Sequence, residues 1–291
     1  MSNIEGLPKI SGHTQLVGLV ATPIRHSLSP ALHTASFARM GEDIVYLCFE
    51  VGPNHLEAAC EGMRAMGFLG YNVSMPNKTI VSRYLDELTP AAELMGAVNC
   101  VDLTTGKAIG HNTDGAGFWR NVKECGIDCK GKKITVVGAG GAGSAVFTQA
   151  ALDGVSEIDV FNVKDDFYKA AQQRCAMLSE RTRAKVTMHD LADEDDLRAS
   201  VAESALFANA TRVGMSPDLE GCVLPEDCLR PDLAVADTVY NPQETKLLRM
   251  AQDHNCKVAL GLGMMMWQAA IGEEIWTGKQ MDIPYIKSLF F

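Results

Sequence analysis

The feature that most restricts the fold is a glycine-rich turn, VVGAGGAG at residues 136–143, which lies between an apolar run and an alanine-rich segment. Gly138, Gly140 and Gly143 follow the G-x-G-x-x-G spacing in the strand-to-helix setting that this motif requires. The first glycine allows a tight turn, the second lets the backbone approach a pyrophosphate, and the third allows close helix–strand packing. The pattern therefore predicts a dinucleotide-binding unit. The alternative is a glycine turn with a purely structural role.

Short apolar runs alternate with longer helical segments along the rest of the chain. We expect strands at 15–21, 43–51 and 67–73, a helix after each, and a strand pair that turns at Thr105-Gly106. Ser29 is expected to cap the first helix, and Gly41 to follow its last residue. This alternation is typical of an α/β fold with a mainly parallel sheet covered on both faces. A domain boundary is expected near residues 110–130.

Composition excludes several classes of protein. A net charge of −10 argues against a nucleic-acid-binding surface. No apolar run reaches the ~18 residues that a membrane span needs, and the first twelve residues lack the pattern of a signal peptide. The nine scattered cysteines indicate reduced thiols and a cytoplasmic protein, and no histidine cluster accompanies them to predict a metal site.

The strand after the glycine turn ends in FNVKDD, where dinucleotide-binding units place a residue that binds the adenosine ribose. Asn162 fills the usual position, and Asp165 follows three residues later. A carboxylate accepts hydrogen bonds from the ribose hydroxyls of NAD and repels the 2′-phosphate of NADP, so Asp165 favours NAD over NADP. Lys164 is a cation that could approach a phosphate, so NADP stays open as a second cofactor.

Four polar stretches, RHSLSP, NVSMPNK, GAVNC and HNTDGAG, each follow a predicted strand in the first half of the chain. Ligands of parallel α/β sheets bind beyond the carboxyl ends of the strands, so the four stretches are expected to meet in one crevice. Together they offer hydroxyls, an amide, a carboxylate and a lysine, which suits a small polyol that carries a carboxylate. Taken singly, Ser29 and Asp114 could be helix caps and Asn99 a turn residue.

Seven segments resemble, in order, the motifs of the shikimate dehydrogenase family, and the chain is most similar to its quinate/shikimate dehydrogenase branch. They are PIRHSLSPALH, NVSMPNK, GAVN, HNTDGAGF, GAGGAG, VYNPQETKLL and GLGMMMWQAA. The resemblance implies a substrate domain at 1–113 and 262–291 and a Rossmann NAD(P)-binding domain at 114–261. It also implies an enzyme that moves a hydride reversibly between the C3 hydroxyl of shikimate or quinate and a nicotinamide, with a small-molecule partner and, as a further option, a homodimer.

The resemblance also assigns roles to individual residues. The family's catalytic lysine and its partner aspartate fall on Lys78 and Asp114. Substrate-binding positions fall on Ser27, Ser29, Tyr46, Ser74, Asn99, Thr113, Tyr240 and Gln268, of which the first two bind the carboxylate. Cofactor-binding positions fall on Gly138, Ala139, Gly140, Gly141, Ala142, Gly143, Asn162, Val163, Lys164, Asp165, Arg212, Val239 and Gly261.

Two rival interpretations stay open from the sequence. One is an enzyme that acts on an amino- or otherwise modified shikimate, which would differ at the pocket rim, for instance around Tyr46 and Cys100, where Cys100 replaces the threonine of the commoner GAVNT motif. Ser74 also replaces a commoner threonine, as in the quinate/shikimate branch. A non-catalytic sensor of NAD and shikimate is the other rival, although it would need no proton-transfer pair.

For the pair of Lys78 and Asp114, burial lowers the pKa of a lysine while a nearby carboxylate raises it. The sequence leaves open which of the two groups holds the proton.

Overall fold

The computed structural model describes residues 10–291, so most of the N-terminal stretch considered for a signal peptide lies outside the described residues. The chain forms two compact units. The first unit runs to Thr113 and resumes at Ala269–Phe291, and the second comprises Asp114–Gln268. The second boundary falls inside helix α9 (Gly261–Thr277).

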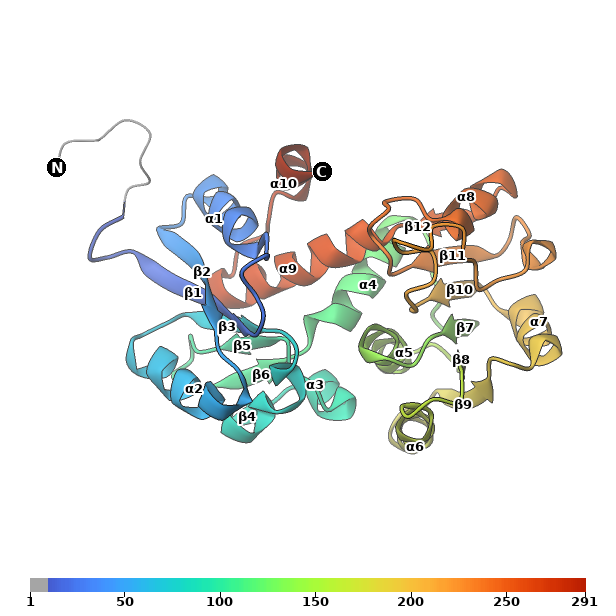
Figure 1. Ribbon diagram of the computed structural model, residues 1–291, viewed down its shortest axis with the longest axis horizontal. Coiled ribbons are helices and arrows are strands. Elements are labelled where there is room, and N and C mark those ends of the chain that lie inside the picture. The colour runs from blue at the N-terminus through green and yellow to red at the C-terminus, as the bar shows by residue number, and fades with distance from the viewer. Residues whose placement is uncertain (1–9) are drawn as a thin grey trace. The chain divides into compact units, whose positions relative to one another are not determined.

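The first unit contains a six-stranded sheet in the order β2-β1-β3-β5-β6-β4 (Figure 1). The strands are β1 (Gln15–Ala21), β2 (Ile44–Glu50), β3 (Gly70–Val73), β4 (Glu87–Leu88), β5 (Cys100–Asp102) and β6 (Ile109–His111). Only β5 runs against its neighbours, so the sheet is mainly parallel as predicted. Val17 and Leu19 of β1 join one buried cluster while Val20 joins the other, because alternate side chains point to opposite faces.

Helices cover both faces of this sheet. They are α1 (Ser29–Met40), α2 (Leu56–Ala65), α3 (Pro90–Met95), the end of α9 and α10 (Ile283–Phe290). Gly41 adopts φ +75° after α1, which confirms the predicted end of that helix. Ser29 is not the helix cap: Leu28 occupies that position, and the Ser29 N–H instead donates to Ser27 Oγ at 3.2 Å.

The segment after Lys78 also differs from the prediction of a helix. It forms two short 3₁₀ turns, Asn77–Thr79 and Val81–Tyr84, before the chain extends into β4. The next α-helix, α3, begins only at Pro90, where the Thr89 hydroxyl accepts the Ala92 N–H and proline occupies the first turn.

The second unit contains a six-stranded, fully parallel sheet in the order β12-β11-β10-β7-β8-β9. Its strands are β7 (Lys133–Val137), β8 (Glu157–Asn162), β9 (Lys185–Asp190), β10 (Leu206–Asn209), β11 (Ala234–Asp237) and β12 (Lys257–Ala259). Two sets of three strands run outward from the β7/β10 pair, which is the doubly wound order of the Rossmann fold. The predicted fold class is thus confirmed.

The helices of this unit are α4 (Thr113–Glu124), α5 (Gly141–Asp153), α6 (Tyr168–Arg181), α7 (Glu194–Glu203), α8 (Lys246–Asp253) and the first part of α9. Within residues 10–291, none of the helices is long and apolar enough to cross a membrane. The same residues contain no group of three or more histidine, cysteine or acidic side chains that could hold a metal ion.

Candidate functional site

In the first unit, a continuous chain of hydrogen bonds joins polar residues of β2, β3, the loop before β5 and the start of α4. The Tyr46 hydroxyl on β2 donates to Asn72 Oδ1 on β3 at 2.7 Å, and Asn72 Nδ2 donates to the Asn99 carbonyl at 3.0 Å. Asn99 in turn accepts the Thr113 N–H at 2.8 Å and lies 3.0 Å from the Thr113 hydroxyl oxygen. Three predicted substrate-binding residues therefore belong to one network, and Asn72 is a fourth member that the sequence analysis did not identify.

The two serines expected to bind a carboxylate lie at the start of α1. Ser29 begins the helix, and Ser27 lies two residues earlier, where its Oγ accepts the Ser29 N–H at 3.2 Å. Both serines are half-buried. Hydroxyls near the positive end of a helix dipole are suited to bind an anion.

Tyr46 is 1% exposed and remains a protonated hydrogen-bond donor. Its burial raises the pKa of the phenol well above the usual value, and the negative charges that Cys48, Cys100 and Glu273 carry when ionised add to this effect. Because Asn72 directs its amide nitrogen to the Asn99 carbonyl, its oxygen faces Tyr46, and the phenol must donate to it. The network therefore has a defined direction.

Lys78 lies on a turn whose backbone is fixed on both sides. Its carbonyl accepts the Val98 N–H at 2.8 Å, and the preceding Asn77 donates its N–H to the Ser74 carbonyl at 2.9 Å. Asn77 is buried, and its Nδ2 donates to the Val51 carbonyl at 2.8 Å. A rigid turn thus presents Ser74 and Lys78, both half-buried, just beyond the end of β3.

Asp114 lies in the first turn of α4, where a carboxylate interacts favourably with the positive end of the helix dipole. It is half-buried and directly follows Thr113, whose N–H is held by Asn99. Lys78 belongs to the first unit and Asp114 is the first residue of the second. Their pairing therefore stays a prediction.

In the second unit, the glycine turn has the steric restrictions that its spacing predicts. Gly138 adopts φ +103°, and a Cβ at Gly143 would lie 1.8 Å from the Gly138 carbonyl oxygen. A Cβ at Gly140 or at Gly141 would instead meet no atom within 4 Å. The first and third glycines are therefore required by the fold, whereas the middle of the turn has open space beside its backbone.

The residue at the end of β8 holds this turn in place. Asn162 Oδ1 accepts the Ala139 N–H at 3.0 Å, and Asn162 Nδ2 donates to the Val163 carbonyl at 2.8 Å and to Asp165 Oδ1 at 3.2 Å. The same Asp165 oxygen accepts the Phe167 N–H at 3.0 Å. Both amide donors of Asn162 thus serve the loop, so Asp165 is the better candidate for ribose hydroxyls.

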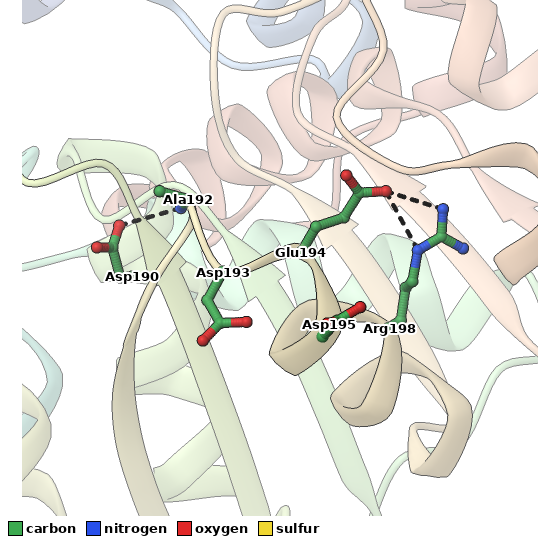
Figure 2. A pocket seen from close by; sticks show the side chains of 6 residues that line it. All are labelled: Asp190, Ala192, Asp193, Glu194, Asp195 and Arg198. Atoms are coloured by element: carbon green, nitrogen blue, oxygen red, sulfur yellow. Dashed lines mark hydrogen bonds and ion pairs between the residues drawn. The ribbon is translucent and has the colours of Figure 1, made fainter.

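Two of the predicted cofactor-binding residues are cations, Lys164 and Arg212. Lys164 forms an ion pair with Asp190 at 2.7 Å, and this hydrogen bond raises the pKa of the lysine. Arg212 is exposed on the loop after β10. Asp190 also borders a hollow at the end of β9, lined by Asp190, Ala192, Asp193, Glu194, Asp195 and Arg198 (Figure 2). Because Glu194 already binds Arg198 at 2.8 Å, the hollow is acidic and poorly suited to a phosphate.

A buried carboxylate controls the loop after β11, where Val239 and the half-exposed Tyr240 were expected to line the ligand site. Asp237 accepts hydrogen bonds from the Val239 N–H at 2.9 Å, from Asn209 Nδ2 at 3.0 Å and from the Thr245 hydroxyl at 2.7 Å. Burial raises the pKa of Asp237 to about 6, against the lowering effect of these donors. Asp237 could not be identified from the sequence, because nothing there distinguishes one aspartate at a strand end from another.

The start of α9 contacts this loop and α4. A Cβ at Gly261 would lie 2.3 Å from the Val239 carbonyl oxygen, and a Cβ at Gly117 would lie 2.5 Å from the Gln268 nitrogen. These glycines let backbones approach closely within the second unit. Gln268 Nε2 donates to the Met265 carbonyl at 3.1 Å.

Known proteins are similar to this chain over nearly its whole length. The family model of the shikimate dehydrogenase substrate binding domain matches residues 19–101, and that of the shikimate 5′-dehydrogenase C-terminal domain matches residues 261–288. A relative from Listeria innocua, named shikimate dehydrogenase (NADP(+)), is 52% identical over 97% of this chain and 98% of its own.

Solved structures are similar over nearly the whole chain. A shikimate 5-dehydrogenase from Listeria monocytogenes, in complex with shikimate and NAD, has 52% identity and a TM-score of 0.95 over 98% of this chain and 99% of its own. A quinate dehydrogenase from Corynebacterium glutamicum, in complex with NAD, has 30% identity and a TM-score of 0.84 over 95% of this chain and 98% of its own.

Proposed function

The chain belongs to the shikimate dehydrogenase family, and we propose that it oxidises the C3 hydroxyl of shikimate, and reduces the corresponding ketone, with a nicotinamide dinucleotide. The observation that carries this proposal is the hydrogen-bond network from Tyr46 through Asn72 and Asn99 to Thr113. It joins three residues predicted to bind the substrate, and two serines that suit a carboxylate lie at the start of α1 in the same unit. The glycine turn supplies a matching diphosphate site.

The reaction requires a proton to leave oxygen while a hydride leaves carbon. Bound NAD or NADP would accept the hydride. We assign the proton to the pair of Lys78 and Asp114, in which Lys78 takes the hydroxyl proton during oxidation and returns it during reduction. The fixed turn around Lys78 supports this role, because a general base must be held within hydrogen-bond reach of its proton.

For the cofactor, we propose that the protein uses NAD preferentially and also accepts NADP. Asp165 supports the preference, since it lies on the loop after β8 and is negatively charged. Lys164 is a cation that could bind a 2′-phosphate, but it already forms an ion pair with Asp190. The relative named for NADP(+) and the similar structure that contains NAD make both cofactors reasonable.

Quinate is a second candidate substrate. It is favoured by the similarity to a quinate dehydrogenase and by Ser74, which matches the quinate/shikimate branch. Neither a modified shikimate nor a sensor role is favoured by the relatives described above. A cytoplasmic location and a homodimer remain predictions.

The decisive experiment measures kcat/KM for shikimate and quinate, each with NAD and with NADP, from the absorbance of the reduced nicotinamide. We expect turnover of shikimate with both cofactors and a higher efficiency with NAD. Absence of turnover with every pair would refute the proposed reaction, whereas a higher efficiency with NADP would refute only the cofactor preference.

A further inference from the structure

A buried acidic side chain lies in the apolar interior of the first unit. Glu273 of α9 is 0% exposed, and its two carboxylate oxygens contact His33 Nδ1 and Ser36 Oγ of α1, each at 2.6 Å. His33 and Ser36 are also buried. Burial of an ionised carboxylate costs several kcal/mol unless hydrogen bonds compensate it, and an apolar side chain often packs as well in the same place. The presence of this group therefore needs an explanation beyond packing.

The cluster is connected to the proposed substrate site through Tyr46. The His33 imidazole stacks on the Tyr46 ring, with centroids 4.4 Å apart and planes inclined by 14°. Trp276, also on α9, lies beside the tyrosine, with the two ring centroids 6.5 Å apart. Glu273 thus fixes the histidine ring, and this ring forms one wall of the space that holds the tyrosine. Within the first unit, α1, β2 and the end of α9 are neighbours (Figure 1).

The position of the Tyr46 ring decides where its hydroxyl lies. That hydroxyl donates to Asn72 Oδ1 at 2.7 Å, and Asn72 Nδ2 donates to the Asn99 carbonyl. A small rotation of the ring would disturb the hydrogen bond between Tyr46 and Asn72, since a hydrogen bond weakens steeply as its geometry departs from the optimum. The orientation of the half-buried Asn72 side chain therefore depends on two buried residues, His33 and Glu273.

We propose that His33 and Glu273 form a buried positioning pair that holds Tyr46, and through it Asn72, in the geometry that binds the ring of the substrate. This proposal rests on the function proposed above, because it takes the network of Tyr46, Asn72 and Asn99 as part of the site for shikimate. The pair touches neither substrate nor cofactor. It acts before the reaction, so its loss weakens substrate binding more than it slows the chemical step.

Two substitutions test the pair. Glu273→Leu removes both hydrogen bonds while roughly keeping the volume, and His33→Asn removes the stacked ring while leaving an amide donor for Glu273. Each is expected to raise the KM for shikimate by about tenfold or more, with kcat and the KM for the dinucleotide changed by less than about threefold. Glu273→Gln, which can still accept from His33 and donate to Ser36, is expected to restore a KM close to wild type.

A matched control lies in the second unit. Ser200→Ala removes a 2.7 Å hydrogen bond from the buried carboxylate of Asp159. It is expected to lower the Tm without changing the KM for shikimate. A shikimate KM that also rises in this variant would mean that lost stability alone explains the effect, and would overturn the proposal.

A double-mutant cycle separates positioning from a structural role. Tyr46→Phe removes the hydroxyl and keeps the ring, so the KM effect of His33→Asn should largely vanish when both changes are combined. Fully additive effects, or a wild-type KM in a folded His33→Asn variant, would overturn the proposal. If Glu273→Leu fails to fold, the KM of His33→Asn and this double-mutant cycle still test whether the pair positions Tyr46. Absence of shikimate turnover in the wild type would instead refute the proposed function.

Discussion

In the first unit, the predicted substrate-binding residues are side chains that hold one another, from Tyr46 through Asn72 and Asn99 to Thr113. The second unit presents backbone at the predicted diphosphate position: a turn with open space at Gly140 and Gly141, which Asn162 holds through the Ala139 N–H. Side chains can match the hydroxyl pattern of one small molecule, whereas backbone N–H groups suit any diphosphate. The difference shows how one chain can combine selectivity for a substrate with a general site for a cofactor.

The strongest test of this contrast is Lys78→Ala, because it removes the one side chain proposed to move a proton. We expect kcat to fall about 10²–10⁴-fold while the KM for shikimate changes little, as is typical for loss of a general base. Thr79→Ala, an exposed neighbour on the same turn, is the control and should keep wild-type kcat. A loss of less than about tenfold would remove Lys78 from the acid–base role.

Gly143→Ala tests whether the cofactor site depends on backbone geometry. The added Cβ would lie 1.8 Å from the Gly138 carbonyl oxygen, so the turn must move. We expect a loss of about 1–3 kcal/mol of stability, as for other overpacked sites, together with a higher KM for the dinucleotide. Gly140→Ala should leave the Tm of the free protein unchanged and raise only this KM. Equal behaviour of the two variants in both measurements would contradict the distinction.

The second unit also contains a buried polar side chain that holds a loop, Asp237. Its raised pKa should make the free energy of unfolding depend on pH. Its pKa is raised in the folded state, from 3.8 to about 6, so the folded protein binds the proton more tightly than the unfolded chain. Its contribution to stability is therefore most favourable below about pH 4, decreases as the pH rises to about 6, and then stays level, a change of about 2–3 kcal/mol.

Asp237→Asn should remove this pH dependence while its oxygen still accepts from Val239 and Asn209. The measurement is urea unfolding of both proteins between pH 4 and pH 7. The stability difference between wild type and variant should change across that range. A constant difference would show that Asp237 titrates normally.

The smallest expected effect concerns cofactor choice. Asp165→Ala should narrow the preference for NAD by less than about tenfold, because one carboxylate on an exposed loop contributes at most about 1.4 kcal/mol. Asp166→Ala, which removes an adjacent exposed carboxylate, is the matched control. The measurement is the ratio of kcat/KM for NAD to kcat/KM for NADP in each variant. An unchanged ratio in Asp165→Ala, or equal changes in both variants, would show that Asp165 does not discriminate.

The sequence predicted best those features that depend on local geometry. The strand at 15–21, the left-handed Gly41 and the Gly138–Gly143 turn were each recognised because glycine spacing and alternating apolar residues follow directly from backbone sterics. Two short helices, α7 and α10, were missed. α7 is polar over most of its surface, with only Leu197, Ser200 and Val201 buried, so its apolar periodicity is weak.

Features that depend on distant partners were not predictable in this way. Asn72 was part of a recognised motif, yet its importance appears only when Tyr46 and Asn99 lie on either side of it. His33 and Glu273 are 240 residues apart in sequence. The sequence around each of them contains no motif that predicts its burial. A single sequence carries no signal for such a pairing, because the apolar surroundings that define it come from other elements.

The return of the chain to the first unit at Ala269 also has a consequence for synthesis. The Asp114–Gln268 unit is continuous and can fold as soon as Gln268 leaves the ribosome, since domains fold as units from the N-terminal side. The first unit must wait for Trp276, whose indole nitrogen donates to the Val101 carbonyl at 3.0 Å and would contact any side chain at Gly70. The segment translated first is therefore completed last, and until then its apolar face around Phe37 lacks its cover, which is when a chaperone would be most useful.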